Sequence, residues 1–297
     1  MARGATPDQP GGAAQADRSA RAVFLLTGPA YLWLTVTVLL PLVAMLYFSF
    51  LSEAPIAGRV GELTLEQYRA FFEHGFYLEL ILRSLRLGAE VTLFCFLLGF
   101  PCAYVLAKTI KGRWREALFL LVIIPFWSNA LVRVFSWTMV LRGNGLLERA
   151  IETVFPGAGS LDLLFTYNAV VIGLVHSYLP YMILTCYISL QAIDDDLIAA
   201  ARSLGASWLT ILRRLILPLA MPGIVAGAVL IFVPVIGSFM EPRILGGRQG
   251  TFIGTIIEDQ FTAVFNWPLG AALSFILLAC VLVIFIPFTF AARRVGR

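Results

Sequence analysis

The stretch that decides the fold runs from Asp194 to Pro218 and reads DDDLIAAARSLGASWLTILRRLILP. Three aspartates open it, and carboxylates at a helix start cap free backbone amides and favour the positive end of the helix dipole. Residues 197–204 are rich in alanine, the best helix former, and favour about two turns of helix. Gly205 can adopt the left-handed backbone that ends a helix. A side chain there would strain the backbone and fill the space beside the next helix.

The second half of the stretch predicts another helix. Ser207 is placed to cap a helix over 208–215, and Arg213 and Arg214 complement the negative end of its dipole. Pro218 then marks the entry to the next apolar segment. We therefore expect two short helices, hinged at a glycine, between two apolar segments.

The composition places this stretch in a membrane protein. The chain has 297 residues, of which 59% are hydrophobic and 13% charged, whereas soluble domains carry about a quarter charged residues. A helical span needs about 20 mainly apolar residues, and prolines inside it are tolerated because neighbouring helices satisfy the freed backbone groups. The fold class is an all-α membrane protein. Six spans are expected, at Val23–Phe50, Leu80–Ala107, Ala117–Leu141, Tyr167–Leu190, Leu219–Leu245 and Pro268–Ala292.

The two ends of the chain fix its expected organisation. Residues 1–20 are rich in Gly, Ala, Pro and Gln and predict a disordered tail, followed by one membrane domain over 21–295. The first apolar run is longer than the core of a cleaved signal peptide, about 7–15 residues. Thirteen Lys and Arg lie on the side of the termini and the quoted stretch, and eight on the other. The positive-inside rule therefore predicts cytoplasmic termini and a cytoplasmic loop.

Several kinds of chemistry are missing from the sequence. Lys108 and Lys111 are the only lysines and neither follows a glycine, which excludes a phosphate loop. H-E-x-x-H, C-x-x-C and G-x-S-x-G are also absent, and the four cysteines fit buried small hydrophobes better than disulfides. We expect neither an enzyme nor a cofactor or metal site. The net charge of +4 reflects membrane topology, not nucleic-acid binding.

Ionisable residues within spans are costly, and they usually face an interior cavity or one another. Glu90, Arg133, His176 and Glu241 lie within or near the ends of the expected spans and are candidates for a translocation path. The alternative is structural: Glu90 and Arg133 would form an ion pair, and His176 would pack at an interface. For His176 the sequence favours packing, whereas for Glu90 and Arg133 both interpretations stay open.

Three functions compete for the quoted stretch. Helix–Gly–helix is also the pattern of a DNA-binding motif, but the opening aspartates repel phosphate and both flanks lie in lipid. The pair could instead lie on the membrane surface, with Trp208, Leu209, Ile211 and Leu212 among the head groups. The third function is docking, in which a helix of small side chains allows close approach of a cytoplasmic partner.

The stretch resembles the cytoplasmic loop of binding-protein-dependent ABC importer permeases. That loop has the pattern E-A-A, three residues, Gly, nine residues, I-x-L-P. The matching positions here are Ala199, Ala200, Ala201, Gly205 and Leu215-Ile216-Leu217-Pro218. Two positions differ, because Ala199 stands where the family usually has Glu and Leu215 where it has Ile. The resemblance implies that the loop, residues 191–218, docks in a groove on an ATPase subunit.

The resemblance extends over residues 22–295, and some stretches are similar to the spermidine/putrescine branch of these permeases. Those stretches are Leu131–Trp137, Leu141–Leu147, Leu190–Asp194 and Gly237–Gly247. The branch often has an acidic residue where this chain has Ser238, which adds Ser238 to the candidate path.

The resemblance implies a type I ABC importer permease in a bacterial inner membrane, without an ATPase site of its own. It would work with a cytoplasmic ATPase dimer, a second permease or a copy of itself, and an extracytoplasmic solute-binding protein. The solute would be a polyamine or a related nitrogenous compound. The alternative is an autonomous secondary carrier or channel, which would need inverted repeats or a chain of intramembrane ionisable groups.

Overall fold

The computed structural model describes residues 12–55, 61–156 and 162–295. Within these ranges the chain is helical apart from its connections and one isolated bridge between Leu51 and Leu63. Five helices carry segments long and apolar enough to cross a membrane, and a bent pair forms a sixth crossing if it is counted as one span. The all-α fold class is therefore confirmed. The long helices are α1 (Gly12–Phe48), α3 (Gly75–Tyr104), α7 (Tyr167–Gln191), α10 (Leu217–Ile236) and α13 (Trp267–Val295).

Shorter elements connect these helices. They are α2 (Glu66–Glu73), η1 (Val105–Thr109), α4 (Arg113–Ile123), η2 (Ile124–Trp127), α5 (Ala130–Leu141), α6 (Leu146–Val154), α8 (Asp195–Ser203), α9 (Trp208–Ile211), η3 (Leu212–Ile216), α11 (Met240–Leu245), η4 (Gly247–Gly250) and α12 (Ile253–Thr262). Helix α1 starts at Gly12, within the segment 1–20 that composition predicts to be disordered, and residues 1–11 lie outside the described residues.

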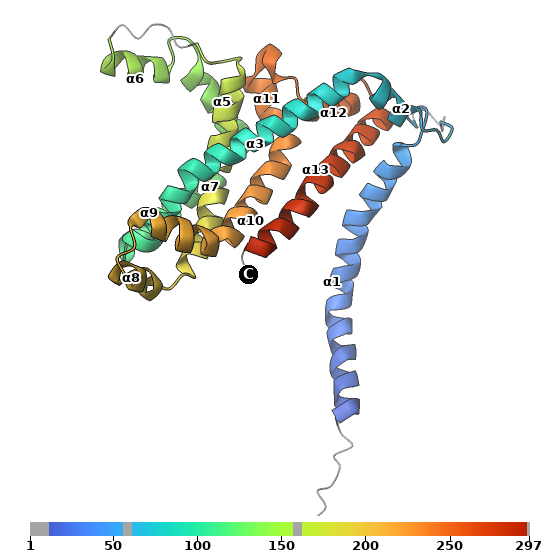
Figure 1. The fold of residues 1–297 in the computed structure, drawn as a ribbon. Coiled ribbons are helices and arrows are strands. Elements are labelled where there is room, and N and C mark those ends of the chain that lie inside the picture. Colours follow the sequence, from blue (N-terminus) through green and yellow to red (C-terminus); the bar gives the residue numbers. More distant parts are fainter. Residues whose placement is uncertain (1–11, 56–60, 157–161, 296–297) are drawn as a thin grey trace, which may run out of the picture.

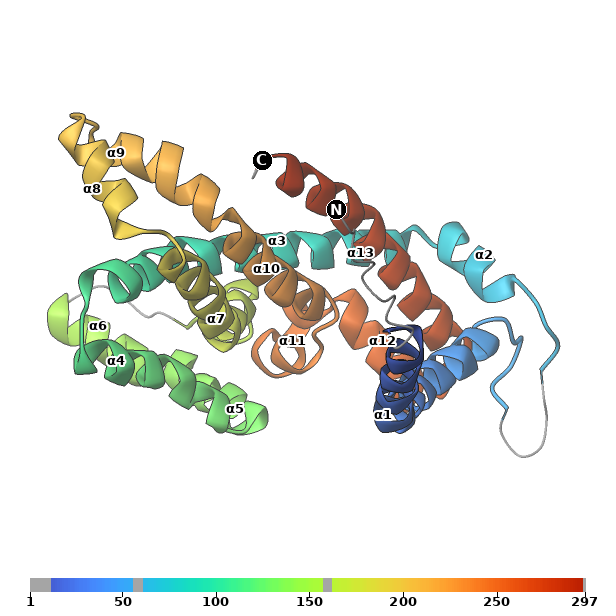
Figure 2. The same ribbon diagram turned by 90° about the horizontal axis from the view of Figure 1, so that it is seen from below.

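The core forms where α3, α7 and α10 pack against one another (Figures 1 and 2). Their facing side chains are fully buried, as with Val91, Leu174 and Ile231. A Cβ atom at Gly223 would lie 2.4 Å from the carbonyl oxygen of Thr185, so only glycine lets α10 approach α7 this closely. Two of the four cysteines are buried, but Cys102 is exposed, which corrects the expectation that all four are buried.

The third predicted span is not one straight helix. The helices that make it up are bent by 95° between Trp127 and Ala130, so Ala117–Leu141 as a continuous span was wrong. Pro125 has no amide hydrogen and lies in a short 3₁₀ turn, and Ser128 is extended. The side chain of Asn129 then caps α5 by accepting a hydrogen bond from the amide of Leu131 at 2.8 Å. The first helix therefore ends at the turn that contains Pro125, the cap at Asn129 starts the next helix, and the bend lies between them.

The fifth predicted span also differs. One continuous helix runs from Trp208 to Ile236 and includes the π-helical turn η3. The second loop helix and the span are therefore a single element. Pro218 lies inside it, and Arg213 and Arg214 lie in its interior instead of at a C-terminal end. The chain then unwinds at 237–239 before α11, so Leu219–Leu245 as one span was wrong.

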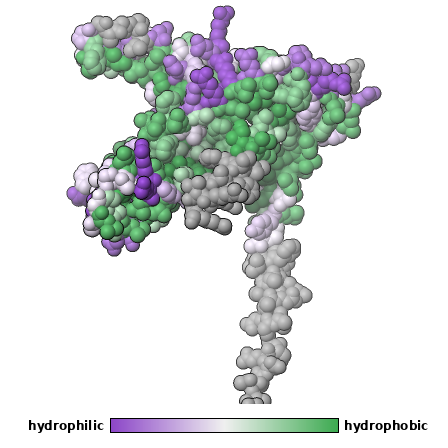
Figure 3. Space-filling model, in the orientation of Figure 1, coloured by the Kyte–Doolittle hydropathy of each residue, from purple (hydrophilic) through white to green (hydrophobic). Residues whose placement is uncertain are grey.

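The molecule has two distinct ends. Helices α8 and α9 lie at the same end as the start of α1 and the end of α13, and α2, α6, α11 and α12 lie at the other (Figure 1). Hydrophilic residues gather at that second end, and apolar residues cover the sides of the bundle (Figure 3). This arrangement agrees with a membrane-crossing bundle in which the start of α1 and the end of α13 lie on the side of the loop.

Candidate coupling loop and translocation cavity

The caps predicted for the quoted stretch are present. Asp194 accepts a hydrogen bond from the amide of Asp196 at 3.0 Å and starts α8. Gly205 has a φ of +79° and separates α8 from α9. Ser207 accepts a hydrogen bond from the amide of Thr210 at 3.3 Å and starts α9. A Cβ atom at Gly205 would have no heavy atom within 4 Å, so the expected crowding there was wrong and only backbone strain remains.

Helix α8 exposes an apolar face. Ala199 and Ala200 are exposed, but Ala201 is half-buried and packs against the core of the protein itself. Two leucines that the sequence analysis did not single out flank the alanines, Leu197 at 49% and Leu204 at 88% exposure. Their spacing of three and four residues from Ala200 puts all three on one helix face, which was the signal for finding them.

The closing motif of the loop lies inside the bundle. Leu215 belongs to the π-helical turn, Leu217 and Pro218 begin α10, and all three are half-buried. Both leucines pack against the buried core. These three residues therefore join the loop to the bundle and present little surface to a partner.

Lys108 fastens the loop to α3, a contact that the sequence analysis missed. Its side chain is 7% exposed and its Nζ donates hydrogen bonds to Ile193 O at 2.5 Å and Asp195 Oδ1 at 2.6 Å. The hydrogen bond and charge of Lys108 lower the pKa of the Asp195 carboxyl. Next to it, the rings of Tyr104 and Trp208 lie 5.2 Å apart. The start of the loop is thus held by charge to η1, the turn that continues α3, and the start of α9 is held to the end of α3 by aromatic contact.

Three candidate path residues line one cavity of about 330 Å³, although they come from distant parts of the sequence. They are Arg133 on α5, Ser238 in the unwound segment after α10, and Glu241 on α11. Tyr178 and Tyr181 of α7 form an aromatic wall. The bend before α5 brings this helix into contact with α11, so the irregular backbone lines a cavity, as membrane proteins require.

The charged groups of the cavity have neutral partners. Glu241 is 8% exposed, and Ser238 Oγ donates a hydrogen bond to Glu241 Oε2 at 2.7 Å. Arg133 Nη1 donates a hydrogen bond to Pro125 O at 3.0 Å. Among the described residues no ion pair involves Arg133 or Glu241.

His176 and Glu90 lie outside this cavity. His176 shares a neighbouring cavity of about 310 Å³ with Arg133, and its ring meets Trp137 edge-on at 5.3 Å. Glu90 accepts hydrogen bonds from Arg86 Nε at 2.7 Å and Tyr167 Oη at 2.6 Å. The alternative of a Glu90–Arg133 ion pair was therefore wrong, because Arg86, one helical turn away, takes the place of Arg133.

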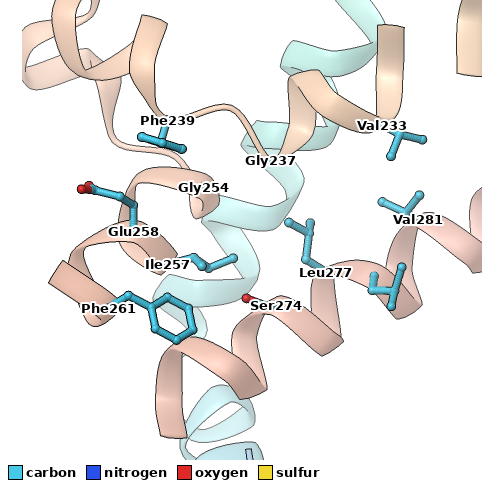
Figure 4. Close-up of a pocket in the computed structure, with 11 residues that line it drawn as sticks. Val233, Gly237, Phe239, Gly254, Ile257, Glu258, Phe261, Ser274, Leu277 and Val281 are labelled. Carbon is cyan, nitrogen blue, oxygen red and sulfur yellow. The ribbon is translucent and has the colours of Figure 1, made fainter. Parts of the chain in front are cut away.

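A second cavity lies on the other side of the unwound segment. Its volume is about 490 Å³, and apolar side chains of α10, α12 and α13 gather around it (Figure 4). Gly237 and Phe239 line both cavities, so this segment is the wall between them. Glu258 turns its carboxylate away from the apolar side chains (Figure 4) and pairs with Arg243, which also bonds Asp259 at 2.6 Å. The hydrogen bond to Asp259 raises the pKa of Arg243 and ties α11 to α12.

A helical bundle with several membrane crossings, a hinged loop at one end and a charged cavity near the other defines a membrane transport permease. Residues 99–297 match the family described as binding-protein-dependent transport system inner membrane component, and the chain belongs to this family. It is a multi-pass protein of the inner membrane.

Its relatives include named permeases. The spermidine/putrescine transport system permease protein PotB of Escherichia coli (strain K12) is 37% identical over 242 residues, which are 82% of this chain and 87% of PotB. The inner membrane ABC transporter permease protein YdcU of the same organism is 30% identical over 264 residues, 85% of this chain and 83% of YdcU.

A solved structure shares the fold. A chain in the crystal structure of a bacterial ABC transporter involved in the import of the acidic polysaccharide alginate superposes with a TM-score of 0.78. The superposition covers 95% of this chain and 99% of that chain at 14% identity, and at that identity it shows the fold alone. The predicted importer permease fold is confirmed.

Proposed function

We propose that this permease moves a small nitrogenous solute with an ammonium group, and that the cavity around Glu241 is part of its path. One observation carries the proposal: a buried carboxylate lies in a cavity walled by aromatic rings. A carboxylate attracts an ammonium group, and the rings of Tyr178 and Tyr181, which line the cavity, can add cation–π attraction. Polyamines, which the name of PotB specifies, belong to this chemical class.

The remaining parts of the importer follow from the exposed loop. The exposed apolar face of α8 indicates a protein partner, and we assign α8 to a cytoplasmic ATPase dimer. ATP hydrolysis belongs to that partner, because this chain has no phosphate loop. A second permease or a copy of this chain completes the pore, and a solute-binding protein delivers the solute at the end formed by α2, α6, α11 and α12. Both termini are then cytoplasmic.

Coupling would proceed through the loop. Closure of the ATPase dimer on nucleotide moves α8, and the bundle changes from inward-open to outward-open because the two states make different contacts with the ATPase. The alternative, an autonomous carrier, finds less support, because Glu90 lies apart from the other path residues and pairs with Arg86.

The test uses the complete importer in proteoliposomes with a panel of labelled amines that contains putrescine, spermidine and amino acids, and it follows the amine that wild type takes up. Glu241→Gln should reduce ATP-driven uptake at least tenfold while the ATPase still co-purifies. Glu66→Gln, an exposed acid on α2 outside the cavity, is the matched control and should behave as wild type. Unchanged uptake by Glu241→Gln would remove the cavity from the path. Uptake by this chain alone, driven by an ion gradient, would show that the protein is a secondary carrier and not a subunit of an ABC importer.

A further inference from the structure

The cavity holds one charge of each sign. Glu241 and Arg133 are its only charged lining groups among the described residues, and they form no ion pair with each other. Each has a neutral partner instead, a serine hydroxyl for Glu241 and a backbone carbonyl for Arg133. Two opposite charges thus line one small space and remain apart.

Two opposite charges that line one cavity without pairing lower the stability of the protein unless a bound ligand interacts with both. Charged groups with little access to water are expensive, and opposite charges that share a cavity would reduce this cost by pairing. In the described part of the chain no ion pair joins them. Arg133 is held at the start of α5 by Pro125 in the preceding bend, and Glu241 sits on α11, itself fixed to α12 through Arg243. A molecule with both charges could satisfy both groups at once.

We infer that the solute is a zwitterion, an amine that also carries a carboxylate. This inference rests on the proposed function and narrows it. The ammonium group binds Glu241 and the aromatic faces, and the carboxylate binds the Arg133 guanidinium, whose planar donors match a carboxylate. A diamine of the same length places its second positive charge near Arg133 and is repelled. A cavity of about 330 Å³ has room for a molecule of amino-acid size.

Binding should be measured on the permease assembly itself, because a solute-binding protein imposes its own selectivity. The assembly with its ATPase, in lipid nanodiscs and without the binding protein, is titrated with four labelled compounds. All have four carbons: 4-aminobutanoate, 2-aminobutanoate, 1,4-diaminobutane and butanoate. At least one of the two amino acids should bind at least tenfold more tightly than the diamine and the simple acid.

Substitutions then assign the two charges. Arg133→Gln should raise the affinity for the diamine relative to the amino acid at least tenfold. Glu241→Gln should raise the affinity for butanoate relative to the amino acid at least tenfold. Arg133→Lys keeps the positive charge and should keep the preference for the amino acid. Arg248→Gln removes an exposed arginine outside the cavity and is the matched control. Co-purification of the ATPase shows that each variant is folded.

The outcomes separate this inference from the function on which it rests. If the diamine binds wild type as tightly as the amino acids do and this binding depends on Glu241, the inference of a zwitterionic solute is refuted, and the proposed path for an amine stands. If the affinity for none of the four compounds responds to Arg133 or Glu241, both are refuted.

Discussion

Replacement of Gly205 tests whether the loop couples the permease to an ATPase. The φ of +79° at this position is unfavourable for residues with a Cβ atom, and most of all for β-branched ones. The left-handed conformation costs an L-residue about 1–2 kcal/mol. A Cβ atom there has free space, so this strain is the whole cost expected from the structure. It corresponds to a reduction of about 5–30-fold in the population of the observed loop conformation.

The size of the effect should depend on the residue that replaces Gly205. Gly205→Val should weaken ATPase binding within that range and lower solute uptake per ATP hydrolysed. Gly205→Asn should have a smaller effect, because Asn tolerates the left-handed region better than Val. Titration of the purified permease with the ATPase gives the affinity, and proteoliposomes give the coupling.

The chain offers a matched control at Gly112. Its φ is +63° and a Cβ atom there also has no heavy atom within 4 Å, but it lies in the connection before α4, outside the loop. The ψ of Gly112 is −150°, which together with its positive φ is a backbone conformation essentially restricted to glycine. Gly112→Val should therefore carry at least as much strain as Gly205→Val and leave ATPase affinity unchanged. Full ATPase binding and full transport by Gly205→Val would refute the coupling role and favour a helix pair that lies on the membrane surface. Equal losses from both valine variants would show a general loss of stability.

Four further substitutions test contacts of the loop and of the helix bundle. Lys108→Met removes two hydrogen bonds donated by a charged group, each worth about 1.5–3 kcal/mol, and should weaken ATPase binding at least tenfold in the same titration. The contribution of Asp195 to this contact is present above its unfolded pKa of about 3.9 and is lost as the pH falls through the lowered pKa, so transport from pH 6 to 8 should not report it. Ala200→Trp should block ATPase binding with the bundle intact, whereas Ala201→Trp should lower thermal stability because it faces the core. Gly223→Leu should prevent assembly, seen by size-exclusion chromatography, because it separates α7 from α10.

The sequence predicted the features that depend on residues close to one another in the chain. Apolar length predicted the long helices apart from the errors at the third and fifth spans, and the fourth span, Tyr167–Leu190, agrees with α7 to one residue. The caps at Asp194 and Ser207 form as predicted, because a cap needs only residues close in sequence. The Arg86–Glu90 pair was also open to prediction, since four residues is the spacing of one helical turn.

Other features depend on packing between distant segments. Pro101 and Pro180 stay inside continuous helices, whereas Pro125 begins a sharp bend, so proline alone does not tell the cases apart. Nor does the spacing of Arg133 and Glu241 reveal that they line one cavity, because their proximity follows from the packing of α5 against α11.

The helix that begins in the loop gives the two sites a physical connection. The sequence predicted a separate loop helix and a span that starts near Pro218, but one helix of 29 residues runs from Trp208 to Ile236. At 1.5 Å per residue it is about 43 Å long, close to the full thickness of a bilayer with its head groups. Its first turn follows Gly205, and its last residue is followed by the unwound segment that carries Ser238 and leads to Glu241. In the proposed mechanism one continuous helix, packed against α3 and α7, thus joins the ATPase contact to the wall of the cavity. A displacement of the loop then moves that wall, because close-packed helices transmit movement to their neighbours.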